Sequence, residues 1–144
     1  MSDDREAANA FNARNKTIID EFHANDGKLS GNFESAPVLL LHTTGAKSGK
    51  ERVNPMMYLN KDGRIFVFAS KAGADTNPDW YHNLVATPSV TVELGTEEFA
   101  AIASPLPEDE RAKIYAKQAE LYPGFAEYQE KTSRAIPVVE IVRS

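Results

Sequence analysis

The sequence contains no cysteine, which excludes disulfide bonds, thiolate nucleophiles and zinc sites built on thiolates. Long apolar runs are also absent. The longest, such as residues 38–41, have only the length of a β-strand, so no membrane-spanning segment is expected. Residues 1–6 are polar and acidic and lack the basic start and apolar stretch of a secretory signal. These absences predict a soluble, cytoplasmic protein without stable membrane association.

The composition also disfavours several classes of function. The net charge of −5 at pH 7 opposes binding to nucleic acid, whose phosphates attract basic proteins. The three histidines, His23, His42 and His82, have neither metal-like spacing nor evident acidic partners, so no metal site is expected. No serine lies in a nucleophile-elbow pattern and no acid pair suggests glycoside hydrolysis. Hydrolase activity is therefore disfavoured as well.

The length of 144 residues, with ordinary apolar content, predicts one domain over residues 1–144. Its N-terminal part, residues 1–24, is expected to be helical, because Phe11, Asn15, Ile18 and Phe22 recur at helical spacing without an intervening glycine or proline. The polar face of this helix carries charges of both signs, which favours docking on the domain over binding to a membrane. The cofactor-binding core is expected in residues 37–144.

The remaining pattern predicts an α+β fold in which hairpin-connected strands close a small antiparallel barrel. Asp62-Gly63 between two apolar runs is a strong hairpin signal. Asn77 is the expected cap of a short helix with Pro78 at its first position. Strands are predicted over residues 37–43, 52–59, 64–70, 90–94, 99–103 and 137–142, with further helices over 108–121 and about 125–134.

Residues 43–52 form the most informative segment, because they connect two predicted strands through two glycines and several cations. The glycines let the backbone approach a ligand, and Lys47, Ser48 and Arg52 supply donors suited to phosphate or carboxylate oxygens. The segment is not a P-loop, since it leads into a strand. Taken by its spacing alone, a plain solvated hairpin is an equal alternative. Basic residues dominate from Thr43 to Ala74, although Lys61 and Arg64 are explained by solvation of the Asp62-Gly63 turn.

Aromatic residues supply two further candidate surfaces. Trp80 and Asn83 are three residues apart and share one helix face, which could lie against a planar ring system. The alternative is that Trp80 belongs to the core and His82 faces water. Tyr122, Phe125 and Tyr128 can share one surface across the Pro123-Gly124 break. They could line a pocket and donate a proton, or they could attach the C-terminal helix to the barrel.

Three segments taken together resemble the deazaflavin-dependent nitroreductase family. They are Leu-Leu-His-Thr-Thr-Gly-Ala-Lys-Ser-Gly-Lys-Glu-Arg-Val-Asn-Pro from Leu40, Ala-Ser-Lys-Ala-Gly-Ala from Ala69, and Asn-Pro-Asp-Trp-Tyr-His-Asn-Leu from Asn77. The similarity extends to Tyr-Pro-Gly-Phe from Tyr122 and Arg-Ala-Ile-Pro from Arg134. It implies a split β-barrel with helices packed around it, which binds reduced coenzyme F420, a 5-deazaflavin with a phosphate and an oligoglutamate tail.

The resemblance also implies the residues of the cofactor site. Four residues of the glycine loop would hold the phosphate and tail, namely Ala46, Lys47, Ser48 and Arg52. The wall of the site would be formed by parts of two strands and closed by the short helix, through Val53, Asn54, Pro55, Met56, Met57, Phe68, Ala69, Ser70, Lys71, Asp79, Trp80, Tyr81, His82 and Asn83.

The implied reaction is hydride transfer from the reduced deazaflavin to an electron-poor small molecule, such as an activated enone or lactone, a quinone or a nitro compound. Tyr128 is the expected proton donor, with Tyr122 or water as alternatives. Phe125 is expected in the acceptor pocket, at a position where relatives active on nitroimidazoles can present tyrosine. Two alternatives are a flavin mononucleotide (FMN)-dependent reductase or oxidase on the same type of barrel, and a non-catalytic F420-binding protein. The protein is expected to be a monomer or a homodimer.

Overall fold

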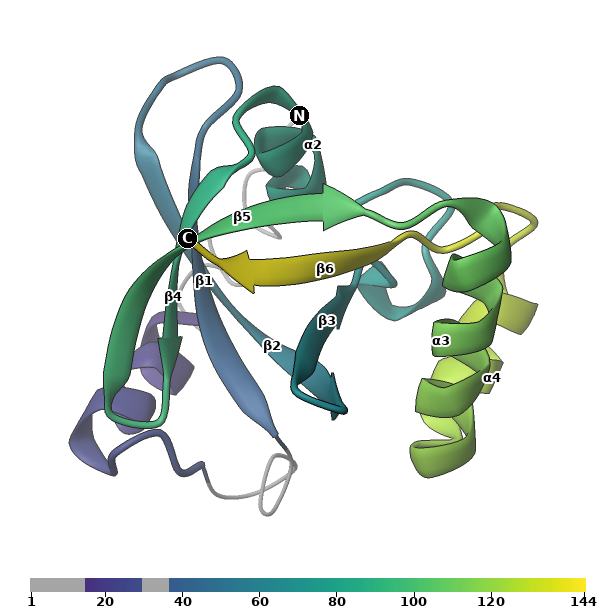
Figure 1. Cartoon of the computed structure of the whole chain (residues 1–144), viewed down its shortest axis with the longest axis horizontal. Coiled ribbons are helices and arrows are strands. Elements are labelled where there is room, and N and C mark those ends of the chain that lie inside the picture. Colours follow the sequence, from purple (N-terminus) through teal and green to yellow (C-terminus); the bar gives the residue numbers. More distant parts are fainter. Residues whose placement is uncertain (1–14, 30–36) are drawn as a thin grey trace, which may run out of the picture.

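A computed structural model describes residues 15–29 and 37–144 and shows six strands that close into one antiparallel barrel within this part of the chain. Around the barrel the strands follow the order β1-β2-β3-β6-β5-β4, and β4 pairs with β1 to close the ring (Figure 1). Their bounds are β1 Val38–Thr44, β2 Glu51–Lys61, β3 Arg64–Phe68, β4 Ser89–Leu94, β5 Glu97–Pro105 and β6 Val138–Arg143. The expected α+β fold with an antiparallel barrel is confirmed.

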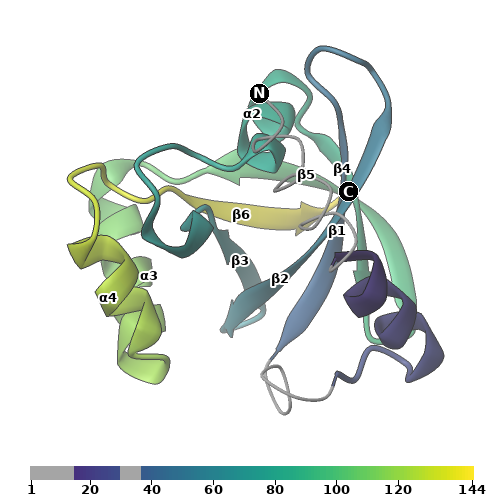
Figure 2. The same cartoon turned by 180° about the vertical axis from the view of Figure 1, so that it is seen from behind.

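Helices lie on two sides and at one end of this barrel. A helix over residues 15–24 lies beside β1 and β4, while α3 (Glu108–Leu121) and α4 (Gly124–Glu130) lie together on the opposite side, as the view from behind also shows (Figure 2). The short α2 (Asp79–Ala86) lies near the loop that joins β1 to β2 (Figure 1). No helix of the described residues has the length and apolar character needed to cross a bilayer.

The strands alternate between an inner and an outer apolar cluster, as the two-residue period of a strand requires. Leu39 and Leu41 of β1 pack inside the barrel with residues of all the other strands, and Trp80 and Leu84 of α2 complete this inner cluster. Phe66 of β3 belongs to the outer cluster, which α3 and α4 cover. The barrel is therefore filled by side chains, and any ligand must lie at its rim or on its outside.

Several predicted boundaries differ from the structure. β3 ends at Phe68, two residues earlier than predicted, and α4 ends at Glu130 rather than near Arg134. The prediction that Asn77 caps α2 is wrong: Pro78 occupies the cap position, and the side-chain oxygen of Asn77 accepts a hydrogen bond from Arg134 instead. Residues 1–14 of the predicted N-terminal helix, with Phe11, lie outside the described residues. The division of the chain into a helix over residues 1–24 and a core over 37–144 stays a prediction.

Candidate functional site

The loop between β1 and β2 has a fixed backbone. The Gly45 N–H donates to the Lys50 carbonyl at 2.8 Å, and the Gly49 N–H donates to the Gly45 carbonyl at 2.9 Å. A Cβ at position 45 would lie 2.5 Å from the Ser48 hydroxyl oxygen, which also accepts a hydrogen bond from the Lys50 N–H. Gly49 adopts a left-handed φ of 69°. The two glycines that were noted in the sequence thus serve a compact, hydrogen-bonded turn.

Asn83 holds this loop from α2. Its side-chain oxygen accepts a hydrogen bond from the Ala46 N–H at 2.9 Å, and its amide nitrogen donates to the Thr43 hydroxyl at 3.2 Å. Asn83 is 7 % exposed and Thr43 only 2 %. The structure therefore brings the predicted site residues Ala46 and Asn83 together and shows Asn83 as the anchor of the loop; its contact with a cofactor stays a prediction.

The loop and the start of β2 carry cations that have no partner among the described residues. The side chains of Lys47, Lys50 and Arg52 are exposed and make no hydrogen bond or ion pair within residues 15–29 and 37–144. By contrast, three other arginines are paired with carboxylates, namely Arg64, Arg111 and Arg143. In a chain of net charge −5, this loop offers uncompensated positive charge to an anion.

The acidic neighbour in this segment, Glu51, is turned away to His42. One ring nitrogen of His42 lies 3.0 Å from a Glu51 carboxylate oxygen, and the other lies 2.6 Å from Glu93, which also contacts His23 at 2.8 Å. Burial acts to lower the pKa of His42, but the hydrogen bonds to Glu93 and Glu51 outweigh it and raise the pKa. The expectation that these histidines lack acidic partners is thus wrong for His23 and His42, because β4 and the start of β2 bring the carboxylates to them.

The predicted wall residues of β2 do not share one face. Met56 packs against the cluster inside the barrel, whereas its neighbour Met57 packs against the outer cluster under α3 and α4. Residues 53–57 are all half-buried and alternate in this way. A ligand on one side of β2 therefore meets the side chains of only every second residue of this segment.

A turn follows β3 and carries two predicted cofactor ligands, Ser70 and Lys71. Ser70 is half-buried, and the Lys71 ammonium donates to the Thr76 hydroxyl at 3.1 Å. Lys71, Ala72 and Gly73 have φ values of 47°, 54° and 85°, so three successive residues are left-handed. This turn lies against α4, since a Cβ at Gly73 would lie 2.9 Å from the Tyr128 carbonyl oxygen. The fold therefore places the turn that contains Lys71 close to α4, the helix of Tyr128.

Arg134 was assigned no role from the sequence, although its Arg-Ala-Ile-Pro motif was part of the family resemblance. Its guanidinium donates to the carbonyl oxygens of Ala69, Ser70 and Ala74 and to the side chain of Asn77. Burial lowers the pKa of this guanidinium, while the nearby Asp75 and Tyr115 act to raise it. Ala69, a predicted wall residue, is fully buried beneath this arrangement.

The predicted α2 residues point in different directions. Trp80 is 8 % exposed and belongs to the barrel core, whereas Asp79 and His82 are exposed. Tyr81 is half-buried, and its ring meets the edge of His82 at a centroid distance of 6.0 Å. The sequence alternative that Trp80 is a core residue with His82 facing water agrees with this placement.

Phe125 is packed in the outer cluster together with the predicted wall residue Phe68. Its ring makes edge contacts with Phe68 at 5.5 Å, Tyr115 at 6.3 Å and Tyr128 at 5.4 Å. The Tyr115 hydroxyl donates to the Phe125 carbonyl at 2.6 Å, and burial raises the pKa of Tyr115 to about 12. With an exposed fraction of 8 %, Phe125 packs against the rings of Tyr115 and Tyr128. Its role in an acceptor pocket stays a prediction.

The two candidate proton donors, Tyr122 and Tyr128, are half-buried at the margin of the outer cluster. Tyr58 of β2 lies near Tyr122: burial raises the pKa of Tyr58, and the proximity of Tyr122 raises it further. Sequence reasoning did not single out Tyr58, because only the closure of the barrel brings β2 to the end of α3.

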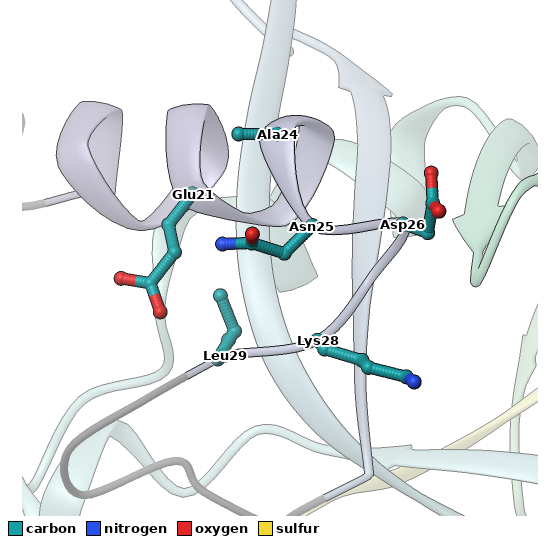
Figure 3. A pocket seen from close by; sticks show the side chains of 6 residues that line it. All are labelled: Glu21, Ala24, Asn25, Asp26, Lys28 and Leu29. Atoms are coloured by element: carbon teal, nitrogen blue, oxygen red, sulfur yellow. The ribbon is translucent and has the colours of Figure 1, made fainter.

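One surface hollow in the described part of the chain lies away from the predicted site. It has a volume of about 460 Å³ and is formed by the helix over residues 15–24 and the turn after it (Figure 3). Its side chains include the acids Glu21 and Asp26, which do not suit an anionic ligand. A second hollow of about 310 Å³ borders the base of the β1–β2 loop, with His42, Thr43 and Gly49 in its lining.

Comparison with known proteins identifies the family of this chain. A model of the F420H(2)-dependent quinone reductase family matches residues 14–142. The chain belongs to this family. The resemblance to a deazaflavin-dependent family, recognised in the sequence motifs, is therefore confirmed.

Individual members of the family are similar over most of the chain. An F420H(2)-dependent quinone reductase of Mycobacterium tuberculosis (strain ATCC 25618 / H37Rv) is 36 % identical over 126 residues, which cover 85 % of each protein. Among solved structures, an F420-H2 dependent reductase (FDR-A) is 42 % identical with a TM-score of 0.66 and covers 73 % of this chain and 93 % of its own. A structure described as a domain-swapped dimer is 36 % identical with a TM-score of 0.68 and covers 93 % and 98 %. These structures confirm the split-barrel fold expected from the sequence.

Proposed function

We propose that this F420H2-dependent reductase holds the phosphate and tail of its cofactor at the β1–β2 loop and reduces a quinone-type acceptor. The observation that carries the proposal is the set of exposed cations, Lys47, Lys50 and Arg52, that lack any partner among the described residues. A cation without a carboxylate partner can bind an anionic ligand without first losing an ion pair.

The residues present fit a cofactor with several negative charges. Besides the three cations, the backbone N–H groups of Lys47 and Ser48 make no hydrogen bond with the described residues and are open to an anion. The single phosphate of FMN needs fewer cations than a phosphate with an oligoglutamate tail, so the number of unpaired cations favours the deazaflavin. Lys71, in the turn after β3, adds a further positive charge.

The proposed work of the protein is positioning and proton supply, because the bound cofactor provides the hydride. Asn83 keeps the β1–β2 loop in place by its two hydrogen bonds, so that the cations beside it present a preformed anion site. Tyr128 lies at the margin of the outer cluster and is proposed to donate a proton to the reduced acceptor, with Tyr122 as the alternative donor. Edge contact with the buried Phe125 limits the motion of the Tyr128 ring.

A quinone is the proposed acceptor because the matching family model and the Mycobacterium tuberculosis relative are both described by quinone reduction. Enones, lactones and nitro compounds are the other electron-poor classes that the same transfer could serve. The sequence expectation treated these classes as open.

Anaerobic turnover tests this proposal. The purified protein is mixed with F420H2 and a water-soluble benzoquinone, and the return of oxidised F420 absorbance is followed, with an enone and a nitroimidazole in parallel. The quinone is expected to react fastest, and Tyr128→Phe is expected to lower its kcat by at least about tenfold, which is modest for loss of a general acid. Tyr122→Phe serves as the matched variant.

Each contrary outcome has a definite meaning. Tight cofactor binding without reduction of any acceptor would make the chain a non-catalytic F420-binding protein. Faster reduction of an enone or a nitro compound would replace the quinone as acceptor. An unchanged rate in Tyr128→Phe, together with a loss in Tyr122→Phe, would transfer the proton-donor role to Tyr122.

A further inference from the structure

The turn after β3 adopts a backbone conformation that its own sequence does not favour. Lys71 and Ala72, with φ values of 47° and 54°, stand next to Gly73 at 85°. Residues with a Cβ rarely adopt this region, and two in succession require surrounding contacts that hold them there. The hydrogen bonds within the turn are short-range, from the Gly73 N–H to the Ser70 carbonyl and from the Ala74 N–H to the Lys71 carbonyl. Something outside the turn must therefore fix it.

Arg134 makes contacts on both sides of this turn. One terminal nitrogen donates to the carbonyl oxygens of Ala69 at 3.1 Å and Ser70 at 3.0 Å, before the left-handed residues. Its Nε donates to the Ala74 carbonyl at 2.8 Å, and the other terminal nitrogen donates to the Asn77 side chain at 2.7 Å, after them. A planar guanidinium can serve acceptors this far apart through three separate nitrogen atoms, whereas the three donors of a lysine ammonium all lie on one nitrogen.

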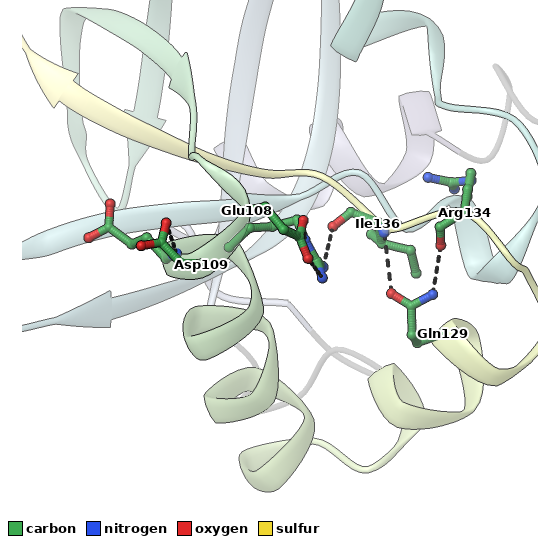
Figure 4. Close-up of polar contacts among 7 residues, drawn as sticks. Glu108, Asp109, Gln129, Arg134 and Ile136 are labelled. Carbon is green, nitrogen blue, oxygen red and sulfur yellow. Dashed lines mark hydrogen bonds and ion pairs between the residues drawn. The ribbon is translucent and has the colours of Figure 1, made fainter.

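Arg134 is in turn fixed to α4. The Gln129 side-chain amide donates to the Arg134 carbonyl at 2.7 Å and accepts a hydrogen bond from the Ile136 N–H at 3.2 Å (Figure 4). Gln129 of α4 therefore holds the backbone of residues 134–136. On the other side of the turn, Gly73 packs against the Tyr128 carbonyl. Arg134 and Gln129 thus join the segment of Lys71 to the helix that carries Tyr128.

We propose that Arg134 is a positioning residue that holds the turn of residues 70–74 in its left-handed conformation and so fixes Ser70 and Lys71 beside α4. Four of its five N–H donors are used by acceptors in and beside the turn, so the guanidinium is expected to act through Lys71 rather than by touching the cofactor itself. The expected effect of Arg134 on cofactor binding rests on the proposed function, whereas its effect on the conformation of the turn does not.

Hydrogen exchange on the cofactor-free protein tests the conformational part. Arg134→Lys keeps the positive charge but removes the planar guanidinium with its separate donor nitrogens. The backbone amides of Gly73 and Ala74 are therefore expected to exchange faster than in the wild type. Mass spectrometry of the peptide that covers the turn measures this exchange. Arg64→Lys is the matched control, because Arg64 pairs with Glu110 and Glu140 instead. Unchanged exchange in the turn of Arg134→Lys would overturn the proposal. If Arg134→Lys does not fold, Asn77→Ala removes only one contact and is judged by the same criterion.

A double-mutant cycle tests the link to Lys71. Arg134→Lys is expected to weaken F420 binding by about tenfold and Lys71→Ala to weaken it similarly, while the double variant binds little worse than either single variant, because both changes remove the same contribution. Arg64→Lys combined with Lys71→Ala is expected to give additive effects. Additivity between Arg134 and Lys71 would contradict the positioning role. If the wild type binds no F420, the proposed function fails, and hydrogen exchange alone still decides whether Arg134 holds the turn.

Discussion

Individual glycines in this protein meet very different surroundings. Gly73 and Gly63 have nearly the same left-handed φ, 85° and 83°. A Cβ on Gly73 would lie 2.9 Å from the Tyr128 carbonyl and 3.0 Å from the Lys131 Cβ, whereas nothing lies within 4 Å of a Cβ on Gly63. The pair therefore separates the effect of backbone conformation from the effect of close packing.

Gly63→Ala is expected to cost about 1 kcal/mol of unfolding free energy, since only the unfavourable φ opposes the new methyl group. Gly73→Ala is expected to cost about 1–3 kcal/mol more, because the backbone of α4 must also move. Urea denaturation of both variants measures the difference. Equal losses would show that α4 does not press against the turn after β3.

At the residue scale, the sequence predicts which positions matter better than it predicts what they do. Asn83 was expected to share a face of α2 with Trp80, and both are buried, but its hydrogen bonds to Ala46 of the β1–β2 loop and to Thr43 of β1 join it to residues 37 and 40 positions earlier in the chain. Arg134 belonged to a recognised motif, yet its acceptors are mostly backbone carbonyls, which carry no signal in a sequence.

At the scale of elements, a chain of ionisable groups links the N-terminal helix to the barrel. His23 of the helix contacts Glu93 of β4, and Glu93 contacts His42 of β1, whose other nitrogen faces Glu51 of β2. Burial acts to raise the pKa of Glu93, but hydrogen bonds from His42 and His23 outweigh it, so the pKa is lowered. The raised pKa of His42 and the lowered pKa of Glu93 both indicate an imidazolium between carboxylates.

This link is expected to make stability depend on pH. A group whose pKa is raised on folding stabilises the fold fully below its unfolded pKa, here about 6.5, and that contribution is lost as pH rises through the folded value. The wild type is therefore expected to exceed His42→Gln in unfolding free energy most clearly at about pH 6, with a smaller difference at about pH 9. Below this range the difference falls again as Glu93 is protonated at its lowered pKa.

Urea denaturation across this pH range, with Glu51→Gln as a second variant, measures the effect. Glu51→Gln removes one of the two carboxylates that face His42 and is expected to retain a weaker pH dependence. A stability difference between the wild type and His42→Gln that stays constant or grows with pH would contradict the ion-pair account.

Element boundaries were predicted well where local chemistry sets them and poorly where tertiary contacts do. The acidic first turn of α3 and the Asp62-Gly63 hairpin agree with the structure. By contrast, β3 stops at Phe68 because Ala69 and Ser70 are drawn into the turn held by Arg134, and α4 stops at Glu130 before the segment that Gln129 spans. Neither arrangement has a local sequence signature.

At the scale of the whole molecule, the fold places three cations that lack a partner among the described residues, Lys47, Lys50 and Arg52, within and beside a single loop of an acidic protein. The loop of Lys47 and the helix α2 lie together near one end of the barrel, while Lys61 ends β2 at the β2–β3 hairpin (Figure 1). The local excess of cations was visible in the sequence. The absence of ion pairs between these cations and other described residues was not visible there, because it depends on the contact of Glu51 with His42.

Titration of the protein with oxidised coenzyme F420, with FMN in parallel and ligand fluorescence as the signal, tests the central claim most directly. We expect tighter binding of F420 than of FMN, weakening as salt is added, and a loss of about tenfold in Lys47→Ala but not in the matched variant Lys61→Ala, whose exposed cation lies in the other hairpin. Tighter binding of FMN, or equal losses in Lys47→Ala and Lys61→Ala, would contradict a deazaflavin site at the β1–β2 loop.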